Sequence, residues 1–363
     1  MDYRPGLEGV IAAETALSMI DGNNGELLLR GRPAGEVAEK CSFEEAAYFL
    51  WYGKQPDAKE LSDFKKTFVK YRELPSRIQN IIDELPADME MMAVLRTAVS
   101  ALGEDAGWPP TVDQAIRVTA VMPSILTYRY RKLHGKPFIE PREDLGHTTN
   151  WLYMLTGEEP KDSHVRALNA YLVLTMEHGL NASTFSARVI SSTQSDLYSS
   201  ITGAIGAMKG PLHGGAPSGV MEMLNAIGTK EDTEPWIRKA LERGDRLMGF
   251  GHRVYKTEDP RAAALKKITA ELSGEDEWLD LAGEVEKTAV RLLAEYKPGR
   301  RLYTNVEFYA AAILRAVALP EVLYSPMFTS SRVVGWTAHV LEQAENNRIF
   351  RPKAAYVGPR SLN

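Results

Sequence analysis

The stretch SFEEAAYFLWYG, residues 42–53, contains the pattern that decides the fold. Ser42 and Glu45 have the spacing of a capping box, in which each side chain bonds the backbone N–H of the other residue at a helix start. Gly53 closes the stretch, and glycine is the residue most often found just beyond a helix C-terminus. The sequence therefore predicts a helix between Ser42 and Gly53.

The same pattern returns along much of the chain. Helical spacing of apolar residues followed by a terminal glycine occurs, among other places, in 163–179, 196–210, 234–244, 259–274 and 277–299. One stretch differs: TALSMIDGNNGELLLRG, residues 15–31, places an Asn-Gly turn between two apolar runs, which indicates a β-hairpin. We therefore expect an all-α protein with a small N-terminal β-hairpin.

Composition and charge narrow the class of protein. The length of 363 residues suggests about two domains, and 44% hydrophobic with 25% charged residues is ordinary for a globular protein. A net charge of -5 argues against a nucleic-acid partner. The single cysteine, Cys41, excludes an intrachain disulfide and a zinc–thiolate cluster. With no signal-peptide pattern and no apolar run of membrane-spanning length, we expect a cytoplasmic protein without a membrane partner.

Two breaks suggest how the chain divides into domains. KGPLHGGAPSG, residues 209–219, is rich in glycine and proline, and Leu319-Pro320 interrupts the chain after a predicted helix. We predict a large helical domain made of residues 1–215 and 318–363, with residues 216–317 inserted as a small helical domain. A cleft between two such parts is a common place for a ligand.

Three of the seven histidines lie in stretches whose glycines make them candidates for a ligand site. His178 lies in EHGLNASTFSAR, His213 in GPLHGGAP and His252 in GFGHRVYKTEDPR. Glycine lets the backbone approach a ligand closely, although any one of these glycines is as often an ordinary cap or hinge. The spacing does not favour a metal site, because no HExxH motif occurs and the histidines are widely separated in sequence. The chain also lacks a nucleophile elbow, a dinucleotide fingerprint and a Walker motif.

Acid–base chemistry by histidines and a carboxylate therefore remains. Glu307 lies in YTNVEFYAAAIL, residues 303–314, near a predicted helix start at which Asn305 would be the cap. Arg261, Arg332 and Arg351 supply cations whose forked guanidinium groups suit a di- or tricarboxylate. Any single arginine is more often part of a structural ion pair, and the sequence alone does not bring these three together.

Six stretches in this order resemble the signature blocks of citrate synthases: EHGLNASTFSAR, MKGPLHGGAPS, LMGFGHRVYKTEDPRA, YTNVEFYAAA, SSRVVGWTAHVLEQ and RIFRPKAAYVG. The resemblance extends back through residues 20–50, so it covers essentially the whole chain, and it is closest to small bacterial citrate synthases. It implies a two-domain helical fold, a homodimer and a site in the cleft. It also implies condensation of acetyl-CoA with oxaloacetate, followed by hydrolysis of citryl-CoA to citrate and CoA, with no metal or redox cofactor.

The resemblance assigns catalytic roles by position. Glu307 matches the base that removes a methyl proton from acetyl-CoA. His213 matches the histidine that hydrogen-bonds the thioester oxygen, and His252 matches the one that polarises or protonates the oxaloacetate carbonyl.

The resemblance also assigns binding roles. His178, Arg261 and Arg332 match positions that bind oxaloacetate, and Arg351 matches an arginine contributed by the partner subunit. Lys256 matches a basic position associated with the CoA phosphates. The segment that would wrap the CoA adenine consists of Leu247, Met248, Gly249, Phe250 and Gly251.

Two departures from the family pattern stand out. Glu307 occupies a position where the family usually has Asp, so its carboxylate lies one methylene further from the backbone. Thr175 stands where many relatives carry a further histidine. The nearest alternative is a 2-methylcitrate synthase, which would use propionyl-CoA. An alternative of another class is a weakly active relative that binds CoA or a dicarboxylate in a regulatory role.

Overall fold

The structure of the chain is a computed structural model that describes residues 3–214, 216–252, 254–270, 277–300 and 302–359. Over these ranges it contains sixteen α-helices, three short 3₁₀ turns and one small sheet. The predicted all-α class with a small N-terminal hairpin is therefore confirmed.

The first ten helices precede the glycine-rich stretch at 209–219. Their bounds are α1 (Ala34–Lys40), α2 (Phe43–Tyr52), α3 (Ala58–Lys70), α4 (Ser76–Glu84), α5 (Met91–Ser100), α6 (Val112–Leu133), α7 (His147–Thr156), α8 (Asp162–Thr175), α9 (Ala182–Ser192) and α10 (Leu197–Met208).

Six further helices begin at or after Ala216, within or beyond this stretch. Their bounds are α11 (Ala216–Ile227), α12 (Thr233–Glu242), α13 (Pro260–Ala270), α14 (Glu277–Tyr296), α15 (Val306–Ala316) and α16 (Tyr324–Glu345). The 3₁₀ turns are η1 (Pro5–Leu7), η2 (Gly103–Asp105) and η3 (Glu321–Leu323).

The capping box predicted for the second helix is present. The N–H of Glu45 donates to Ser42 Oγ at 3.3 Å, and the N–H of Ser42 donates to Glu45 Oε2 at 2.8 Å. Gly53 follows α2 in the left-handed conformation, and its N–H bonds Phe49 O. The local sequence therefore fixes both ends of this helix, as predicted.

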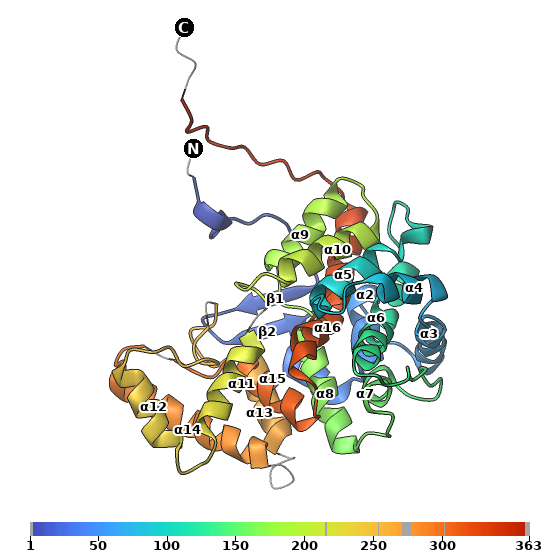
Figure 1. Cartoon of the computed structure of the whole chain (residues 1–363). Coiled ribbons are helices and arrows are strands. Elements are labelled where there is room, and N and C mark those ends of the chain that lie inside the picture. Colours follow the sequence, from blue (N-terminus) through green and yellow to red (C-terminus); the bar gives the residue numbers. More distant parts are fainter. Residues whose placement is uncertain (1–2, 215, 253, 271–276, 301, 360–363) are drawn as a thin grey trace.

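The hairpin is confirmed and gains a short third strand. β1 (Ser18–Asp21) pairs antiparallel with β2 (Glu26–Leu29), and β2 pairs with β3 (Arg32–Pro33). In Figure 1 the hairpin lies between α11, α13 and α15 on one side and the helices around α16 on the other. This small sheet is thus placed close to the elements that carry the predicted site.

Helix α16 is the centre of the larger group of helices. It packs against α6, α8, α9 and α10, and Trp336 in its middle is fully buried. Gly335 allows α16 to approach the end of α8 closely, because a Cβ there would lie 2.3 Å from Met176 O. Close approach of these two helices brings Arg332 of α16 next to the segment that follows α8.

Figure 1 shows α11, α12, α13 and α14 gathered at one side of the molecule. The chain enters this group after α10 and leaves it after α14, and α15 then leads on to α16. Residue 215, where the predicted domain boundary falls, lies outside the described residues. The division into 1–215 with 318–363 and an inserted 216–317 stays a prediction.

Candidate active site

Several predicted site residues lie together where α8, α13, α15 and α16 meet. The rings of His178 and His252 are 5.9 Å apart, and Arg261 Nη2 lies 3.3 Å from His252 Nε2. The charges of Arg261 and Arg332 both act on the pKa of Glu307 and on that of His178. Residues far apart in sequence thus form one cluster, which the sequence pattern alone did not reveal.

The hydrogen bonds of His252 decide which ring nitrogen carries its proton. Its Nδ1 faces the N–H groups of Val254 and Tyr255 at 3.0 and 3.1 Å, and a backbone N–H can only donate. Nδ1 is therefore the acceptor, and the proton of the neutral ring lies on Nε2. Burial, assisted by Arg261, lowers the pKa of His252 to about 4, so the ring is neutral at pH 7.

His252 Nε2–H and Arg261 Nη2–H are both donors. At 3.3 Å from each other they do not satisfy one another, and both are suited to a common acceptor. An oxygen placed between them would accept a hydrogen bond from an imidazole and one from a guanidinium group.

Asp259 holds Arg261 in place. Its two carboxylate oxygens accept from Arg261 Nε at 3.0 Å and Nη2 at 2.8 Å, a bidentate pair in which both residues are buried. Asp259 Oδ2 also accepts the N–H of Val306 at 3.2 Å, at the start of α15. One buried carboxylate thereby connects the arginine to the helix that carries Glu307.

His178 lies in the turn after α8, and Tyr255 is its partner. The Tyr255 hydroxyl is 3.0 Å from His178 Nε2, and the Tyr255 ring packs 4.8 Å from that of His252. Burial lowers the pKa of His178 well below its usual value, and the charge of Arg261 adds to the effect. His178 is therefore a neutral group in the cluster.

Arg332 is buried within α16, with only 2% of its surface exposed. Its Nε donates to Thr175 O at 2.6 Å, which fixes the direction of the side chain. Burial lowers the pKa of Arg332 to about 10, and the carboxylate of Glu177 opposes this effect. The guanidinium remains a cation at neutral pH.

His213 is oriented by two residues from other segments. Its Nε2 lies 2.8 Å from Ser183 Oγ, and that oxygen accepts the indole N–H of Trp336 at 3.0 Å. Because Ser183 occupies Nε2, Nδ1 is the ring nitrogen left to meet a ligand. Burial lowers the pKa of His213 to about 4, with Arg332 adding to the shift, so this ring is also neutral.

Glu307 lies in the first turn of α15. Its N–H donates to Asn305 Oδ1 at 3.1 Å, so the predicted Asn305 cap is confirmed. Burial raises the pKa of the Glu307 carboxyl, Arg261 and Arg332 oppose the rise, and Asp259 adds to it. The result is a carboxylate more basic than one in water, set among the donors described above.

The segment Leu247–Gly251 pairs with the residues that precede α15. The N–H of Gly251 donates to Tyr303 O at 2.7 Å, the N–H of Asn305 donates to Gly249 O at 2.9 Å, and Phe250 forms a β-bridge with Thr304. The position of this segment is therefore coupled to the position of Glu307.

Beside this segment lies a cavity of about 490 Å³ whose lining includes His252. Leu247, Phe250 and Gly251 line it, whereas Met248, Gly249 and Lys256 do not. The cavity also contains three basic residues that the sequence analysis missed, namely Arg246, Lys297 and Arg300. An apolar cavity with basic residues suits a flat ring carrying phosphate groups.

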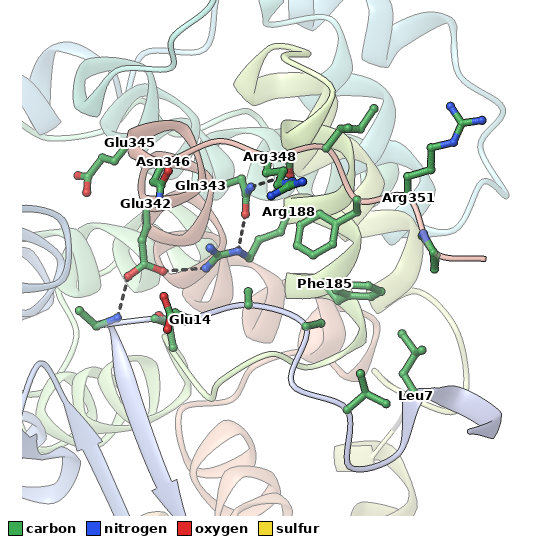
Figure 2. A pocket seen from close by; sticks show the side chains of 18 residues that line it. Leu7, Glu14, Phe185, Arg188, Glu342, Gln343, Glu345, Asn346, Arg348 and Arg351 are labelled. Carbon is green, nitrogen blue, oxygen red and sulfur yellow. Dashed lines mark hydrogen bonds and ion pairs between the residues drawn. The ribbon is translucent and has the colours of Figure 1, made fainter. Parts of the chain in front are cut away.

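Arg351 is not brought to the cluster within this chain. It lies on the extended segment after α16 and lines a larger cavity of about 830 Å³, which includes none of the other predicted site residues. Figure 2 shows this cavity between the N-terminal segment around Leu7, helix α9 with Phe185 and Arg188, and the end of α16. Arg188 there donates to Gln343 Oε1 and Glu342 Oε2 at 2.9 and 2.7 Å.

Ser183, Tyr255, Asp259 and Trp336 also escaped the sequence analysis as functional residues. All four lie inside the quoted sequence blocks, but no spacing rule distinguishes an orienting serine or aspartate from its neighbours. Within the described part of the chain, no group of three or more His, Cys, Asp or Glu residues could hold a metal ion. None of the described helices is long and apolar enough to cross a membrane.

Comparison with known proteins gives consistent matches over the whole chain. A family model described as "Citrate synthase, C-terminal domain" matches residues 6–353. A citrate synthase of Haloferax volcanii is 42% identical over 100% of this chain and 97% of its own length. A 2-methylcitrate synthase of Shewanella oneidensis is 38% identical over 98% of this chain and 96% of its own.

A solved structure agrees with the fold. The ternary complex of the citrate synthase of Thermoplasma acidophilum with carboxymethyl coenzyme A and oxaloacetate is 32% identical to this chain. The TM-score is 0.89, and the match covers 100% of this chain and 98% of that one.

Proposed function

This chain belongs to the citrate synthase family, and we propose that it condenses acetyl-CoA with oxaloacetate and hydrolyses citryl-CoA to citrate and CoA. The observation that carries the proposal is the cluster itself: the donors of His252 and Arg261 meet beside a carboxylate with a raised pKa, Glu307. A base and a separate set of donors are what a carbon–carbon condensation requires.

Glu307 acts as the base in the first step. It removes a proton from the methyl group of acetyl-CoA, and negative charge develops on the thioester oxygen. His213 donates from Nδ1–H to that oxygen, while Ser183 donates to Nε2 and so maintains the required tautomer. Deleting a preorganised donor of this kind typically costs about 3–4 kcal/mol of transition-state stabilisation.

His252 and the arginines hold and activate the second substrate. The Nε2–H of His252 donates to the ketone oxygen of oxaloacetate as the new bond forms at the adjacent carbon. Arg261 and Arg332 bind the carboxylates, and His178 adds a neutral donor or acceptor beside them. Both arginines are fixed by protein contacts before a ligand arrives, which reduces the entropy lost on binding.

We expect the acid side of the pH–rate profile to report Glu307 rather than a histidine. His213 and His252, with pKa values of about 4, stay neutral over the range in which the base titrates. The base acts when ionised, so activity is present above its pKa and lost as pH falls through it. Because burial raises that pKa, the loss should begin at a higher pH than for an exposed glutamate.

The pH dependence of kcat with saturating substrates checks this expectation. Activity that increases as the pH is lowered through the Glu307 range would contradict it. The Glu307→Asp variant is a useful control, because a shifted acid limb in that variant links the limb to this position.

We propose that the cavity of about 490 Å³ takes the nucleotide end of CoA. Replacing Lys297 and Arg300 together with Gln should raise the KM for acetyl-CoA by about 10- to 100-fold or more, because each charge-assisted hydrogen bond contributes about 1.5–3 kcal/mol. The KM for oxaloacetate should not change. Lys287→Gln, an exposed change on α14 outside the cavity, is the control.

Acetyl-dephospho-CoA, which lacks the 3′-phosphate, tests whether the basic residues of the cavity bind that phosphate. If the basic residues meet the 3′-phosphate, the double variant and the wild type should have similar KM values for this analogue. An unchanged KM for acetyl-CoA in the double variant would contradict the assignment. Lys256, which lies outside the cavity, stays a prediction as a CoA phosphate ligand.

We propose a homodimer in which Arg351 reaches the site of the partner subunit. Support comes from the large apolar residues that the two terminal segments expose: Tyr3, Leu7, Val10, Ile11, Ile349, Tyr356 and Val357. Exposed apolar groups gathered on such segments usually mark an interface. Figure 1 shows the described parts of the two terminal segments, in blue and red, on the same side of the molecule. A cytoplasmic location also stays a proposal.

A comparison of thioesters tests the proposed substrate. Condensation of propionyl-CoA is the alternative, because a 2-methylcitrate synthase of Shewanella oneidensis is 38% identical to this chain. One methyl group in an apolar pocket changes selectivity by about 1–3 kcal/mol. We expect a higher kcat/KM with acetyl-CoA. A clear preference for propionyl-CoA would replace our first proposal by the alternative.

A further inference from the structure

We propose that strand β1 and the turn that follows it are a strut that sets the separation between the His178 turn and the His252 loop. The proposal rests on the function proposed above. Neither the hairpin nor its turn has a role in the chemistry described so far. However, the hairpin contacts both of the histidine-bearing segments that would hold oxaloacetate.

The first end of the strut is Ser18. Its hydroxyl donates to Glu177 Oε1 at 2.8 Å, and it accepts the N–H of Gly179 at 3.2 Å. These two residues flank His178. The side chain of Ile20 also packs against Gly179, because a Cβ added to Gly179 would lie 2.9 Å from Ile20 Cδ1. The start of β1 therefore contacts the residue before His178 and the residue after it.

The second end is the turn at Gly22–Gly25. Gly22 O accepts the N–H of Lys256 at 2.7 Å, and a Cβ on Gly22 would lie 2.2 Å from Val254 O. A Cβ on Gly25 would lie 2.5 Å from Thr257 Oγ1 and 2.8 Å from Glu258 O. The turn therefore packs directly on the loop that connects His252 to Asp259 and Arg261.

The segment between these two ends is short, and strand pairing and a side-chain cap within the turn hold its conformation. Gly22 is four positions after Ser18, a span of about 13 Å for extended chain. Pairing with β2 keeps β1 extended, from Ser18 opposite Leu29 to Asp21 opposite Glu26. Asp21 Oδ1 accepts the N–H groups of Asn23 and Asn24 at 2.9 and 3.0 Å, which fixes the turn.

The strut has a geometric consequence for the site. His178 and Tyr255 are joined by a contact of 3.0 Å, and the rings of His178 and His252 are 5.9 Å apart. Movement of the turn would displace the loop that carries Tyr255 and His252 relative to His178. The hairpin is thus a positioning element for the donors that receive oxaloacetate.

Two glycines in the turns on either side of strand β2 make a matched test. Gly25 and Gly31 both have a left-handed backbone, with φ of +67° and +81°, so alanine costs similar backbone strain at each. Only Gly25 faces the loop, since a Cβ on Gly31 would meet nothing within 4 Å. A difference between Gly25→Ala and Gly31→Ala therefore reports the contact with the loop.

We expect Gly25→Ala to lower kcat/KM for oxaloacetate by about 10- to 100-fold, because a displacement of about 1 Å in a site can cost 100-fold. Gly31→Ala should have wild-type kinetics, and the KM for acetyl-CoA should not change in either variant. Hydrogen–deuterium exchange of the peptide containing Lys256 should increase in Gly25→Ala alone, since its N–H bonds Gly22 O.

Identical kinetics and exchange in the two variants would overturn the strut. If Gly25→Ala does not fold, Gly22→Ala is the second variant. Gly22 has no left-handed backbone, and the atoms nearest to an added Cβ all belong to Val254, with Val254 O at 2.2 Å, so its effect also reports the contact with the loop. The exchange measurement needs no turnover. A wild-type protein without synthase activity would therefore refute the proposed function, while the exchange result would still decide the inference.

Discussion

Replacing Glu307 with Gln is expected to lower kcat for CoA release from acetyl-CoA and oxaloacetate by about 100- to 10,000-fold. Gln has nearly the same size and can keep the first turn of α15 intact, but it cannot accept a proton from a methyl group. The Asn305 cap uses the backbone N–H of residue 307 and is not affected. A thiol-release assay on the purified variant measures the loss.

The Glu307→Asp variant keeps the negative charge and changes only the position of the carboxylate, so it separates the two effects. It restores the side chain usual in the family but withdraws the carboxylate by one methylene from a site built around Glu. We expect activity between those of the wild type and the Gln variant, because a misplacement of about 1 Å in a site can cost up to 100-fold. Equal rates in the wild type and Glu307→Gln would refute the role of Glu307 as the base.

Replacing His252 with Asn is expected to lower kcat by about 100- to 1,000-fold, as for the loss of one oxyanion-hole donor. Asn can place Oδ1 close to the position of Nδ1, where it accepts the N–H groups of Val254 and Tyr255. The variant therefore keeps the fold of the loop and loses the Nε2–H that would meet the ketone oxygen.

Steady-state kinetics and thermal unfolding of His252→Asn together check this expectation. A large decrease in kcat with an unchanged Tm is the expected result. Wild-type kcat would show that the Nε2–H of His252 does not act on the substrate. A decrease in both kcat and Tm would attribute the effect to the loop, and in that case His252 would be a structural residue.

The sequence predicted those features that depend on neighbouring residues. The capping box of Ser42 and Glu45, the Asn305 cap and the hairpin at 15–31 all follow from local rules, and the structure contains each of them. Local rules suffice there because the bonded partners lie within a few positions in the chain.

The environment of the histidines depends on distant contacts. Ser183 lies 30 positions from His213 in sequence, and Trp336 lies 153 positions from Ser183, so no spacing predicts their contacts. Asp259 differs, because it is two positions from Arg261, and its role became visible only when the bidentate geometry and the bond to Val306 were known. Packing of α8, α13, α15 and α16 creates these partnerships.

Charge alone did not identify the cavity residues. Lys297 and Arg300 follow a helix and have the sequence pattern of a solvated helix end, and Arg246 lies in a loop 51 positions before Lys297. Their common location next to Phe250 and Leu302 follows from the β-bridge between Phe250 and Thr304. The sequence analysis assigned one basic residue, Lys256, to the CoA phosphates and did not include Arg246, Lys297 or Arg300.

The most direct test of the central claim measures both products at once. Purified wild-type protein is incubated with acetyl-CoA, with oxaloacetate and with both, and free CoA and citrate are quantified. We predict one citrate for each CoA released, and product formation only when both substrates are present. Well-folded protein that forms no citrate, or that releases CoA without oxaloacetate at the same rate, would contradict the claim.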